Sequence, residues 1–405
     1  MSFEVQLYTL DPRKPLPKAD GFTGIWYANQ ASGDEYVYKY SGGLGTYPQQ
    51  QLPIAYYSEA AARTFFCYGG STGFHNELLH CVSYYDHATG EVANPRVLLY
   101  EDHNDAHYNP TLMLDDDGYI WVFSNAHGET NPSYIHRSAE PYSIERFHHI
   151  LTTNFSYSHP WHVNGKGFLF FQTRYSRGVR RVFWQTSPDG YEWSTPQMLA
   201  AIEEGHYAVT WLHEDRLGVA FNYHPHSERV GCKGLNARTN LYYVETRDMG
   251  RTWQTIDGRS LDVPLMVPEN PALVRDYEAE NLLVYLKDLQ FDSGGNPVLL
   301  YMTSQGFESG PANDPRTWCT TRWTGASWET YPITTSDNNY DFGSLYINES
   351  GAWKLIAPTD SGPQPFNPGG EMVLWQSLDE GRNWEKVKAL TSDSRRNHTY
   401  ARRPV

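Results

Sequence analysis

Long apolar runs, paired cysteines and a net positive charge are all missing from this sequence of 405 residues. No stretch approaches the roughly 20 apolar residues of a membrane span, and Met1–Glu4 is neither basic nor apolar. We therefore predict a soluble chain that neither enters a membrane nor carries a signal peptide. Such a chain is extracellular or periplasmic if a leader was removed and cytoplasmic otherwise, which leaves its localisation open.

Charge and cysteine content exclude further classes of protein. The formal net charge is −15, whereas binding to a nucleic-acid backbone needs a basic face. No nucleic-acid partner is expected, but an acidic polysaccharide is compatible if a local basic cluster lines its site. The four cysteines are far apart and form no C-x-x-C pair, which predicts buried thiols at Cys67, Cys81, Cys232 and Cys319.

What the chain does contain is aromatic residues, at 15%, together with 33 Gly and 25 Pro. This mixture suits short strands joined by tight turns. Pairs of short apolar segments recur about every 50 to 70 residues, the length of a propeller blade. The six pairs are Pro53–Ser58 with Thr64–Gly69, Pro110–Asp115 with Tyr119–Ser124, Pro160–Asn164 with Gly167–Gln172, His206–Leu212 with Leu217–Tyr223, Ala272–Arg275 with Asn281–Lys287, and Gly343–Ile347 with Ala352–Ala357.

A second repeated pattern supports the blades. Thr246–Trp253 and Ser377–Trp384 both fit S/T-x-D-x-G-x-x-W, and Ser187–Trp193 is the same turn one residue shorter. In such a turn the hydroxyl and the carboxylate bind backbone amides, while the indole packs between strands. This is the Asp-box of sialidase-like propellers, and it indicates a blade rather than a catalytic site.

Six units leave one blade to be found for a seven-bladed ring. Segments around Gly24–Tyr27 and Glu35–Tyr40, combined with the chain after His398, would supply it by pairing the two ends. We therefore predict an all-β, seven-bladed β-propeller with Asp-box turns that forms a single domain over residues 1–405 and acts as a monomer.

Hairpin geometry then predicts which side chains meet. The residue before the first strand of a hairpin and the residue after the second lie at the same end of the sheet. His107 and His127 hold these two positions in one blade, and Tyr157 and Arg174 hold them in the next. We predict these four side chains as the catalytic residues.

His206 and His224 hold the same positions one blade further on and are predicted to bind substrate. Loops from neighbouring inner strands converge at ligand sites in propellers. Histidine, tyrosine and arginine together can perform β-elimination on a uronate, in which a cation neutralises the carboxylate, a base removes the C5 proton and an acid protonates O4. Arg174 suits the first task because its planar fork matches a carboxylate. The division of the other tasks among His107, His127 and Tyr157 stays open.

Three clusters of residues in the sequence are possible metal sites. Imidazole and thiolate ligands suit zinc, and clustered carboxylates suit calcium. None of the clusters matches a known ligand spacing, so no metal is expected to be needed for the chemistry, and a structural calcium or zinc ion is the alternative. The clusters are His224, His226 and Cys232 for zinc, His103, Asp105 and His107 for an unspecified metal, and Asp115–Gly118 for calcium.

Several long motifs make the sequence resemble the BNR-4 group of seven-bladed propellers. That group includes ulvan lyases, rhamnose-glucuronate lyases and an α-L-rhamnosidase family. The motifs are spread over nearly the whole chain, at Glu35–Tyr47, Gly234–Tyr243, Asn338–Tyr346, Gly362–Gly370 and Asn397–Pro404.

The resemblance implies roles for residues in this chain. His107 and His127 match the two rim histidines of the lyases, Tyr157 their acid/base tyrosine, and Arg174 the arginine that neutralises the carboxylate. Arg238 resembles a further substrate-binding arginine. The lyases of this group cut the bond from rhamnose to O4 of glucuronic acid and leave a 4,5-unsaturated uronate.

The leading hypothesis is therefore a polysaccharide lyase that cleaves a rhamnose-α-1,4-glucuronic acid linkage by β-elimination. One alternative is an exo-acting glycoside hydrolase, either an α-L-rhamnosidase or a sialidase-like enzyme. The related rhamnosidases place a catalytic histidine in the loop after the Gly-Thr-Tyr segment. In this chain that loop reads Pro48–Gln51 and has no histidine, which argues against the hydrolase alternative. A non-catalytic carbohydrate-binding propeller is the second alternative.

Overall fold

The computed structural model describes residues 27–31, 35–36, 38–42, 50–70, 78–102, 105–348 and 351–405. These residues are almost all in strands and turns, and the one α-helix among them is α1 (Ser227–Val230). No helix in the described ranges is long and apolar enough to cross a bilayer. The prediction of an all-β propeller is confirmed.

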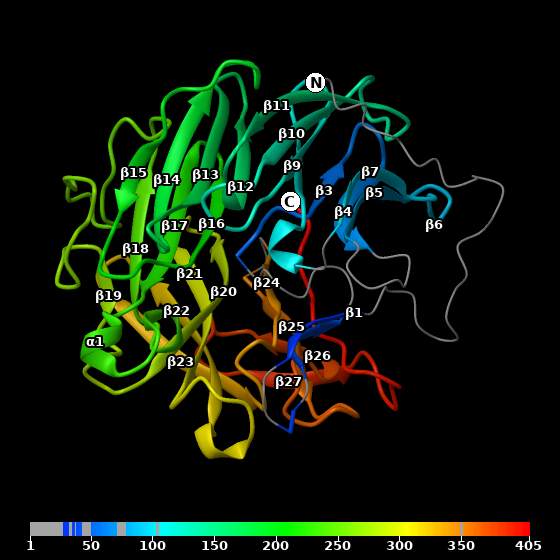
Figure 1. The fold of residues 1–405 in the computed structure, drawn as a ribbon. Coiled ribbons are helices and arrows are strands. Elements are labelled where there is room, and N and C mark those ends of the chain that lie inside the picture. Colours follow the sequence, from blue (N-terminus) through cyan, green and yellow to red (C-terminus); the bar gives the residue numbers. More distant parts are fainter. Residues whose placement is uncertain are drawn as a thin grey trace.

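Six antiparallel sheets are arranged around a ring (Figure 1), and we number them blades 1 to 6 in chain order. Blades 1 to 3 each begin with their innermost strand. Their strands are β3 (Ala55–Ser58), β4 (Arg63–Gly70), β5 (Leu78–Asp86), β6 (Glu91–Val92) and β7 (Arg96–Glu101) in blade 1; β8 (Thr111–Leu114), β9 (Ile120–Ser124), β10 (Ser133–Ser138) and β11 (Phe147–Thr153) in blade 2; and β12 (Ser156–Val163), β13 (Gly167–Ser176), β14 (Val179–Ser187) and β15 (Gln197–Ala200) in blade 3.

Blades 4 to 6 repeat this order of strands. The first strands of neighbouring blades contact each other, β3 with β8, β8 with β12, β16 with β20 and β20 with β24, and so line the inside of the ring. The strands are β16 (Ala208–His213), β17 (Arg216–Tyr223), β18 (Thr239–Thr246) and β19 (Leu273–Arg275) in blade 4; β20 (Leu283–Phe291), β21 (Pro297–Ser304), β22 (Arg316–Trp323) and β23 (Trp328–Ser336) in blade 5; and β24 (Ser344–Ile347), β25 (Trp353–Asp360), β26 (Glu371–Ser377) and β27 (Glu385–Ala389) in blade 6.

The Asp-box turns form as the sequence predicts. In the turn after β18, Thr246 Oγ1 accepts a hydrogen bond from the Gly250 amide at 2.9 Å, and Asp248 accepts one from the Thr252 amide at 2.9 Å. The indole of Trp253 is 2% exposed and packs edge-on against Trp184 of blade 3, with ring centroids 5.2 Å apart. Each turn therefore fastens one blade to its neighbour.

The hairpin between β13 and β14 fixes the register on which the site depends. Its two loop residues, Arg177 and Gly178, both have positive φ, at 53° and 77°. A two-residue loop with this conformation is a type I′ turn, which joins strands without a register shift. Tyr175 is therefore paired with Arg180, and Arg174 with Arg181.

The prediction of a seventh blade is wrong for the part of the chain that the structure describes. The segment Glu35–Tyr40 contributes only to a two-stranded sheet of β1 (Tyr27–Ala31) and β2 (Tyr38–Gly42). The chain after His398 pairs instead at the inside of the ring, where Tyr400 bridges Phe342. The other predicted segment, residues 24–26, lies outside the described residues, and a single domain over all 405 residues stays a prediction.

Residues 400–405, which we call the axial segment, fill the space between blade 6 and blade 1 (Figure 1). The Val405 amide donates to the Ala55 carbonyl at 3.0 Å, and the Val405 carbonyl accepts from the Tyr57 amide at 2.8 Å. The guanidinium of Arg403 lies 3.5 Å from the ring centroid of Trp211 in β16. The ring of six blades is thus closed by backbone pairing to β3 rather than by a further blade.

Replacing Arg402 by alanine is expected to destabilise the fold by about 3–5 kcal/mol, because it leaves a buried carboxylate without its cation. Arg402 and Asp288 form an ion pair of 3.6 Å, and their side chains are 3% and 2% exposed. The measurement is the free energy of unfolding from urea denaturation, with Arg395→Ala, an exposed arginine, as the matched control. Equal stabilities for the two variants would contradict this role.

Acid is also expected to destabilise the fold, because several histidines are buried in their neutral forms. Burial lowers the pKa to about 4 for His107 and His206 and to about 3 for His136 and His159. The unfolded chain, with histidine pKa values near 6.5, therefore takes up protons first as the pH falls. Stability is complete above about pH 6.5 and is lost toward pH 4, at about 1.4 kcal/mol per pH unit for each histidine.

Melting temperatures between pH 8 and pH 4.5 measure this effect. His136→Phe is the informative variant, because neither ring nitrogen of His136 has a hydrogen-bond partner among the described residues. It should melt with a weaker dependence on pH than the parent protein. A melting temperature that stays constant down to pH 5 would rule out the proposed origin.

Candidate active site

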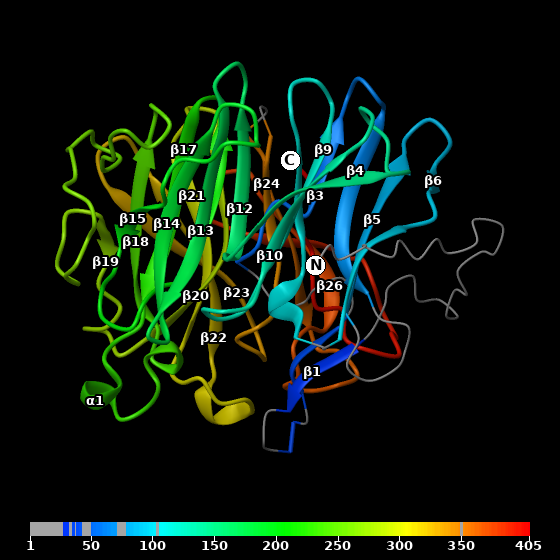
Figure 2. The same cartoon turned by 45° about the horizontal axis from the view of Figure 1, so that its top comes forward.

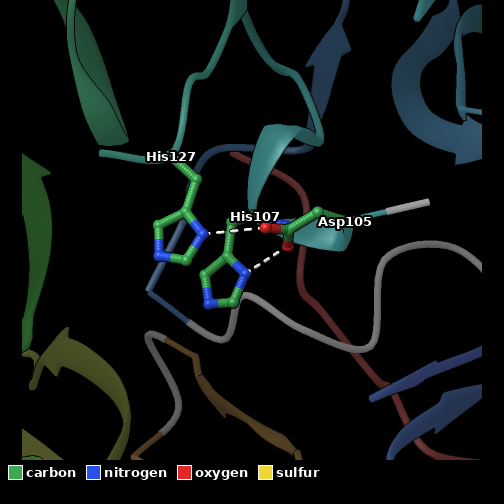
Figure 3. Close-up of side chains that lie close together, drawn as sticks. All are labelled: Asp105, His107 and His127. Atoms are coloured by element: carbon green, nitrogen blue, oxygen red, sulfur yellow. Dashed lines mark hydrogen bonds and ion pairs between the residues drawn. The ribbon is translucent and has the colours of Figure 1, made fainter. Parts of the chain in front are cut away.

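Two histidines and one aspartate form the centre of the site (Figure 3). Asp105 precedes the 3-10 helix Ala106–Tyr108, which carries His107, and His127 follows β9. One carboxylate oxygen of Asp105 accepts a hydrogen bond from Nδ1 of His107, and the other accepts from Nδ1 of His127 at 2.7 Å. The two rings are stacked, with centroids 3.9 Å apart and planes 12° from parallel. The shared carboxylate therefore sets the orientation of both imidazoles.

Asp105 and His107 have defined protonation states. Burial alone would raise the pKa of Asp105, but the hydrogen bonds from His107 and His127 outweigh burial and hold that pKa well below its usual range. Burial lowers the pKa of His107 to about 4 despite the hydrogen bond to Asp105. The trio thus holds an ionised carboxylate beside a neutral His107. Because Nδ1 of each ring donates to the carboxylate, the lone pair of a neutral ring lies on Nε2.

The two histidines differ in their access to solvent. The side chain of His107 is 5% exposed and that of His127 is 28% exposed. Gln51 donates to the backbone carbonyl of His107 at 2.6 Å and so supports this histidine, whereas Pro48 and Gln49 lie outside the described residues. His127 is therefore the histidine that a substrate can reach.

Tyr157 is brought to the trio by a strained backbone. Its φ of 48° lies in the left-handed region, and the pairing of β12 with β13 shifts register between Ser156 and His159. Such a conformation costs a bulky residue about 1–3 kcal/mol and is found mainly at functional sites. The ring lies edge-on to His107, with centroids 5.9 Å apart, and edge-on to Tyr207 of blade 4 at 5.4 Å.

Tyr175 and Arg180 stand opposite the histidine pair. They are cross-strand neighbours on β13 and β14, and Nε of Arg180 donates to the Tyr175 hydroxyl at 3.0 Å. The ring of Tyr175 lies edge-on to His127, with centroids 5.6 Å apart. Burial raises the pKa of Tyr175, against the opposing effects of Arg180 and of a hydrogen bond with Tyr157. Tyr175 is therefore protonated at neutral pH.

The structure does not bring Arg174 into this group. Side chains of successive strand residues point to opposite faces of a sheet, so Arg174 and Tyr175 face different neighbours. Arg174 donates to Gln172 at 3.2 Å and to Gln185 at 3.4 Å. Arg180, rather than the predicted Arg174, is the arginine that lies opposite the histidine pair.

Blade 4 contributes an aromatic and cationic wall. Tyr207, which precedes β16, has the guanidinium of Arg180 5.3 Å and that of Arg238 4.6 Å from its ring centroid. His224, which follows β17, lies edge-on to Tyr207 at 4.9 Å and is 0% exposed. Burial and then the charges of Arg180 and Arg238 hold the pKa of His224 well below its usual range. His224 is thus a neutral imidazole facing two cations.

Arg238 and His206 are more deeply buried than the sequence predicts for substrate-binding residues. Arg238 is 2% exposed and donates to the Leu235 carbonyl at 2.7 Å and to the Tyr340 hydroxyl at 3.2 Å. His206 is 0% exposed, and both of its ring nitrogens hydrogen-bond to backbone atoms of Ile202 and Asn222 at 2.9 Å. His206 therefore lies outside the group, whereas Arg238 borders it through Tyr207.

We call the assembled group the rim cluster. It combines residues from blades 2, 3 and 4. Three of them, Tyr175, Arg180 and Tyr207, were not predicted from the sequence, and Asp105 was predicted only as a possible metal ligand. Strand alternation and the Arg177-Gly178 turn contained the signal for Tyr175 and Arg180. The members are Asp105, His107, His127, Tyr157, Tyr175, Arg180, Tyr207, His224 and Arg238.

Among the described residues, one group of three has potential metal ligands within 4.8 Å of one another, and it is Asp105, His107 and His127. The ligand atoms facing each other there are already joined by hydrogen bonds. His224, His226 and Cys232 do not form such a group, and His103 lies outside the described residues. Asp115 instead stabilises a strand turn, where it accepts from the amides of Asp117 at 3.1 Å and Tyr119 at 2.8 Å.

The fold and the site together define an Asp-box β-propeller whose rim carries a histidine–aspartate trio opposite a tyrosine–arginine pair. A family model for the BNR repeat-containing family matches residues 54–336, which span blades 1 to 5. The chain belongs to this family.

Relatives of known activity are similar over most of the chain. An ulvan lyase of Nonlabens ulvanivorans is 23% identical over 71% of this chain and 65% of its own length. An ulvan lyase of Alteromonas sp. (strain LOR) is 25% identical over 69% of this chain and 62% of its own length. The chain thus spans less than two thirds of the length of these two relatives.

Two solved structures share the fold. A polysaccharide lyase of family PL25, an ulvan lyase bound to -[GlcA(1-4)Rha3S]-, has a TM-score of 0.68 and 18% identity, with 84% of this chain and 83% of that chain covered. The polysaccharide lyase Uly1 has a TM-score of 0.63 and 11% identity, with 92% and 89% covered. At these identities the similarity establishes the propeller fold.

Proposed function

We propose that this protein is a polysaccharide lyase that cleaves the rhamnose-α-1,4-glucuronic acid linkage of ulvan or a related acidic polysaccharide by β-elimination. The observation that carries the proposal is the pairing of an Asp105-oriented His127 with the Tyr175–Arg180 pair across the rim, at a ring distance of 5.6 Å between His127 and Tyr175. The named activities of the relatives support it.

Three tasks of the elimination fall to three residues. Arg180 binds the uronate carboxylate and stabilises the negative charge that develops when the C5 proton leaves. Nε2 of His127 takes that proton, because Asp105 holds the proton of the neutral ring on Nδ1. The C5–H electrons form the C4–C5 double bond as the C4–O4 bond breaks. Tyr175, which burial keeps protonated, donates its proton to O4.

The remaining members position these three groups. His107 supports the His127 ring by stacking at 3.9 Å. Tyr157 is hydrogen-bonded with Tyr175, and Arg180 stabilises the tyrosinate that remains after O4 leaves. Tyr207, His224 and Arg238 form the wall beside Arg180, where we propose that His224 and Arg238, both buried, act on the substrate through Tyr207.

A glycoside hydrolase fits the rim cluster less well. Hydrolysis of this kind uses two carboxyl groups on either side of the scissile bond, one as acid and one as base or nucleophile. Asp105 is the one carboxyl group in the rim cluster, and it is engaged by both histidines.

One assay distinguishes the candidate functions. The protein is incubated with ulvan while ultraviolet absorbance is followed, because a C4–C5 double bond conjugated to the carboxylate absorbs there and the intact polymer does not. Rising absorbance together with shorter chains is the expected result. Shorter chains or free rhamnose without absorbance would identify a hydrolase, and binding without either would identify a carbohydrate-binding module.

Removal of metal ions is expected to leave the initial rate unchanged, because Arg180 and His127 supply the charge and the base of the proposed reaction. The measurement compares rates before and after dialysis against a chelator, with calcium or zinc added back in separate samples. A rate that disappears with the chelator and returns with one of these ions would overturn the metal-independent mechanism.

A further inference from the structure

A cavity lies away from the rim cluster, between blades 3 and 4. Its volume is about 420 Å³, and it is lined by Lys166, Thr186, Ser187, Pro188, Gln197, Met249, Gly250 and Arg251. A volume of this size is within the range of small-ligand sites and can hold one or two sugar units. Neither the proposed reaction nor the family assignment gives this cavity a role.

The cavity lies at the opposite end of the strands from the rim cluster. Lys166 is in the turn between β12 and β13, whereas Tyr157 is at the start of β12 and Tyr175 is near the end of β13. Blades 3 and 4 are neighbours in the ring (Figure 2). At about 3.3 Å per residue, β13 separates the two sites by about 25 Å. A sugar bound in the cavity therefore cannot occupy the active site at the same time.

The lining is unusual for a chain that carries a net charge of −15. It contains two cationic side chains and no acidic one. The Asp-box carboxylates of the same two turns are directed at their own backbone, since Asp189 accepts from the Tyr191 amide and Asp248 from the Thr252 amide, both at 2.9 Å. These two aspartates are thereby occupied within their turns.

Both cations are available to a ligand. Arg251 is exposed, and its guanidinium makes no hydrogen bond or ion pair with any described residue. Lys166 contacts Asp215 at 2.8 Å, but the two side chains are 42% and 53% exposed, and an exposed pair of this kind contributes little. Gln197 and Thr186 add an amide and a hydroxyl that suit sugar hydroxyl groups.

We propose that this cavity is a second binding site for anionic saccharides, in which Arg251 and Lys166 hold the sulfate or carboxylate groups of a polysaccharide chain. The guanidinium fork matches either oxyanion, and the ammonium adds a point charge. The site retains a polymer on the enzyme while the rim cluster acts on another segment or another chain. Multivalent attachment of this kind raises the effective concentration of substrate.

Binding of a fluorescently labelled dextran sulfate oligomer tests the site directly. This probe carries sulfate groups but no uronate, so β-elimination cannot consume it. The double variant Lys166→Ala/Arg251→Ala is expected to bind it about tenfold more weakly, since two exposed ionic contacts are lost. Cleavage of short ulvan oligosaccharides should be unchanged in this variant, because the rim cluster is intact.

Two control variants show whether a loss of binding is specific to the cavity. Lys388→Ala/Arg395→Ala removes the same number of exposed charges from blade 6 and should keep the affinity of the parent protein. Arg180→Ala should also keep it, whether or not the chain proves to be a lyase. Unchanged binding by Lys166→Ala/Arg251→Ala would overturn the proposal, and so would an equal loss in the blade 6 control.

Discussion

Arg180→Ala is expected to lower kcat on ulvan by about 10²–10³-fold, the loss typical for removal of one group that stabilises a developing negative charge. Arg180 is the cation that contacts Tyr175 at 3.0 Å and faces Tyr207 at 5.3 Å. Without it the uronate carboxylate stays charged, the C5 proton is less acidic, and the tyrosinate of Tyr175 loses its counter-charge. Initial rates of ultraviolet absorbance measure the effect.

Arg174→Ala is the matched control for this variant. Arg174 lies on the same hairpin but on the opposite face of β13, where it donates to Gln172 and Gln185. Its loss is expected to change kcat by less than about threefold, since it touches none of the groups that stabilise developing charge. A large loss in Arg174→Ala with normal turnover in Arg180→Ala would return the carboxylate-binding role to Arg174.

Asp105→Asn is expected to lower kcat by about 10³-fold while the protein stays folded. His107 and His127 bind different carboxylate oxygens of Asp105, and in asparagine one of these oxygens is replaced by an NH₂ group, which cannot accept a hydrogen bond. Nδ1 of one ring then loses its partner, and the tautomer with the lone pair on Nε2 is no longer enforced at His127. Substitution of the carboxylate that orients the catalytic imidazole of a Ser-His-Asp triad lowers kcat by about 10⁴-fold, so a large loss is expected here too.

A spectroscopic readout separates orientation from simple structural damage. Protons shared between an imidazole Nδ1 and a carboxylate resonate far downfield in proton NMR, and Asp105→Asn should lose two such signals. Asp116→Asn is the control, because Asp116 contacts Nδ1 of His162 at 3.2 Å away from the rim cluster. That variant should keep its activity and the two rim signals. Full activity of Asp105→Asn would refute the shared-carboxylate mechanism.

The sequence was sufficient for the blades because each blade is a local unit. A hairpin of short apolar strands and an Asp-box turn such as Thr246–Trp253 depend on residues close together in the chain. The number of blades cannot be predicted from such local patterns. It depends on how residues about 350 positions apart pair, as Val405 does with Ala55, and no repeat in the sequence carries that information.

The sequence predicted part of the group of side chains that meet at this rim, but not which arginine lies among them. Strand ends located His107, His127 and Tyr157, which the structure brings together with ring distances of 3.9 Å and 5.9 Å. The choice between Arg174 and Arg180 required the register of β13 and β14, which the two positive φ values of Arg177 and Gly178 determine. The sequence predicted Asp105 only as a possible metal ligand. No sequence pattern indicates its contact with His127, because the two residues lie at opposite ends of a hairpin in the chain.

The axial segment has a consequence for how the protein reaches its folded state. Blades 1 to 5 can form from neighbouring parts of the chain, but blade 1 gains its last backbone partner only when residues 400–405 dock against β3. Closure of a loop of about 350 residues costs conformational entropy, and contacts that distant in sequence form late and slowly. During synthesis on the ribosome, the inner edge of blade 1 therefore stays unpaired until blade 6 has been made. In this interval the chain is most prone to aggregation and most dependent on chaperones.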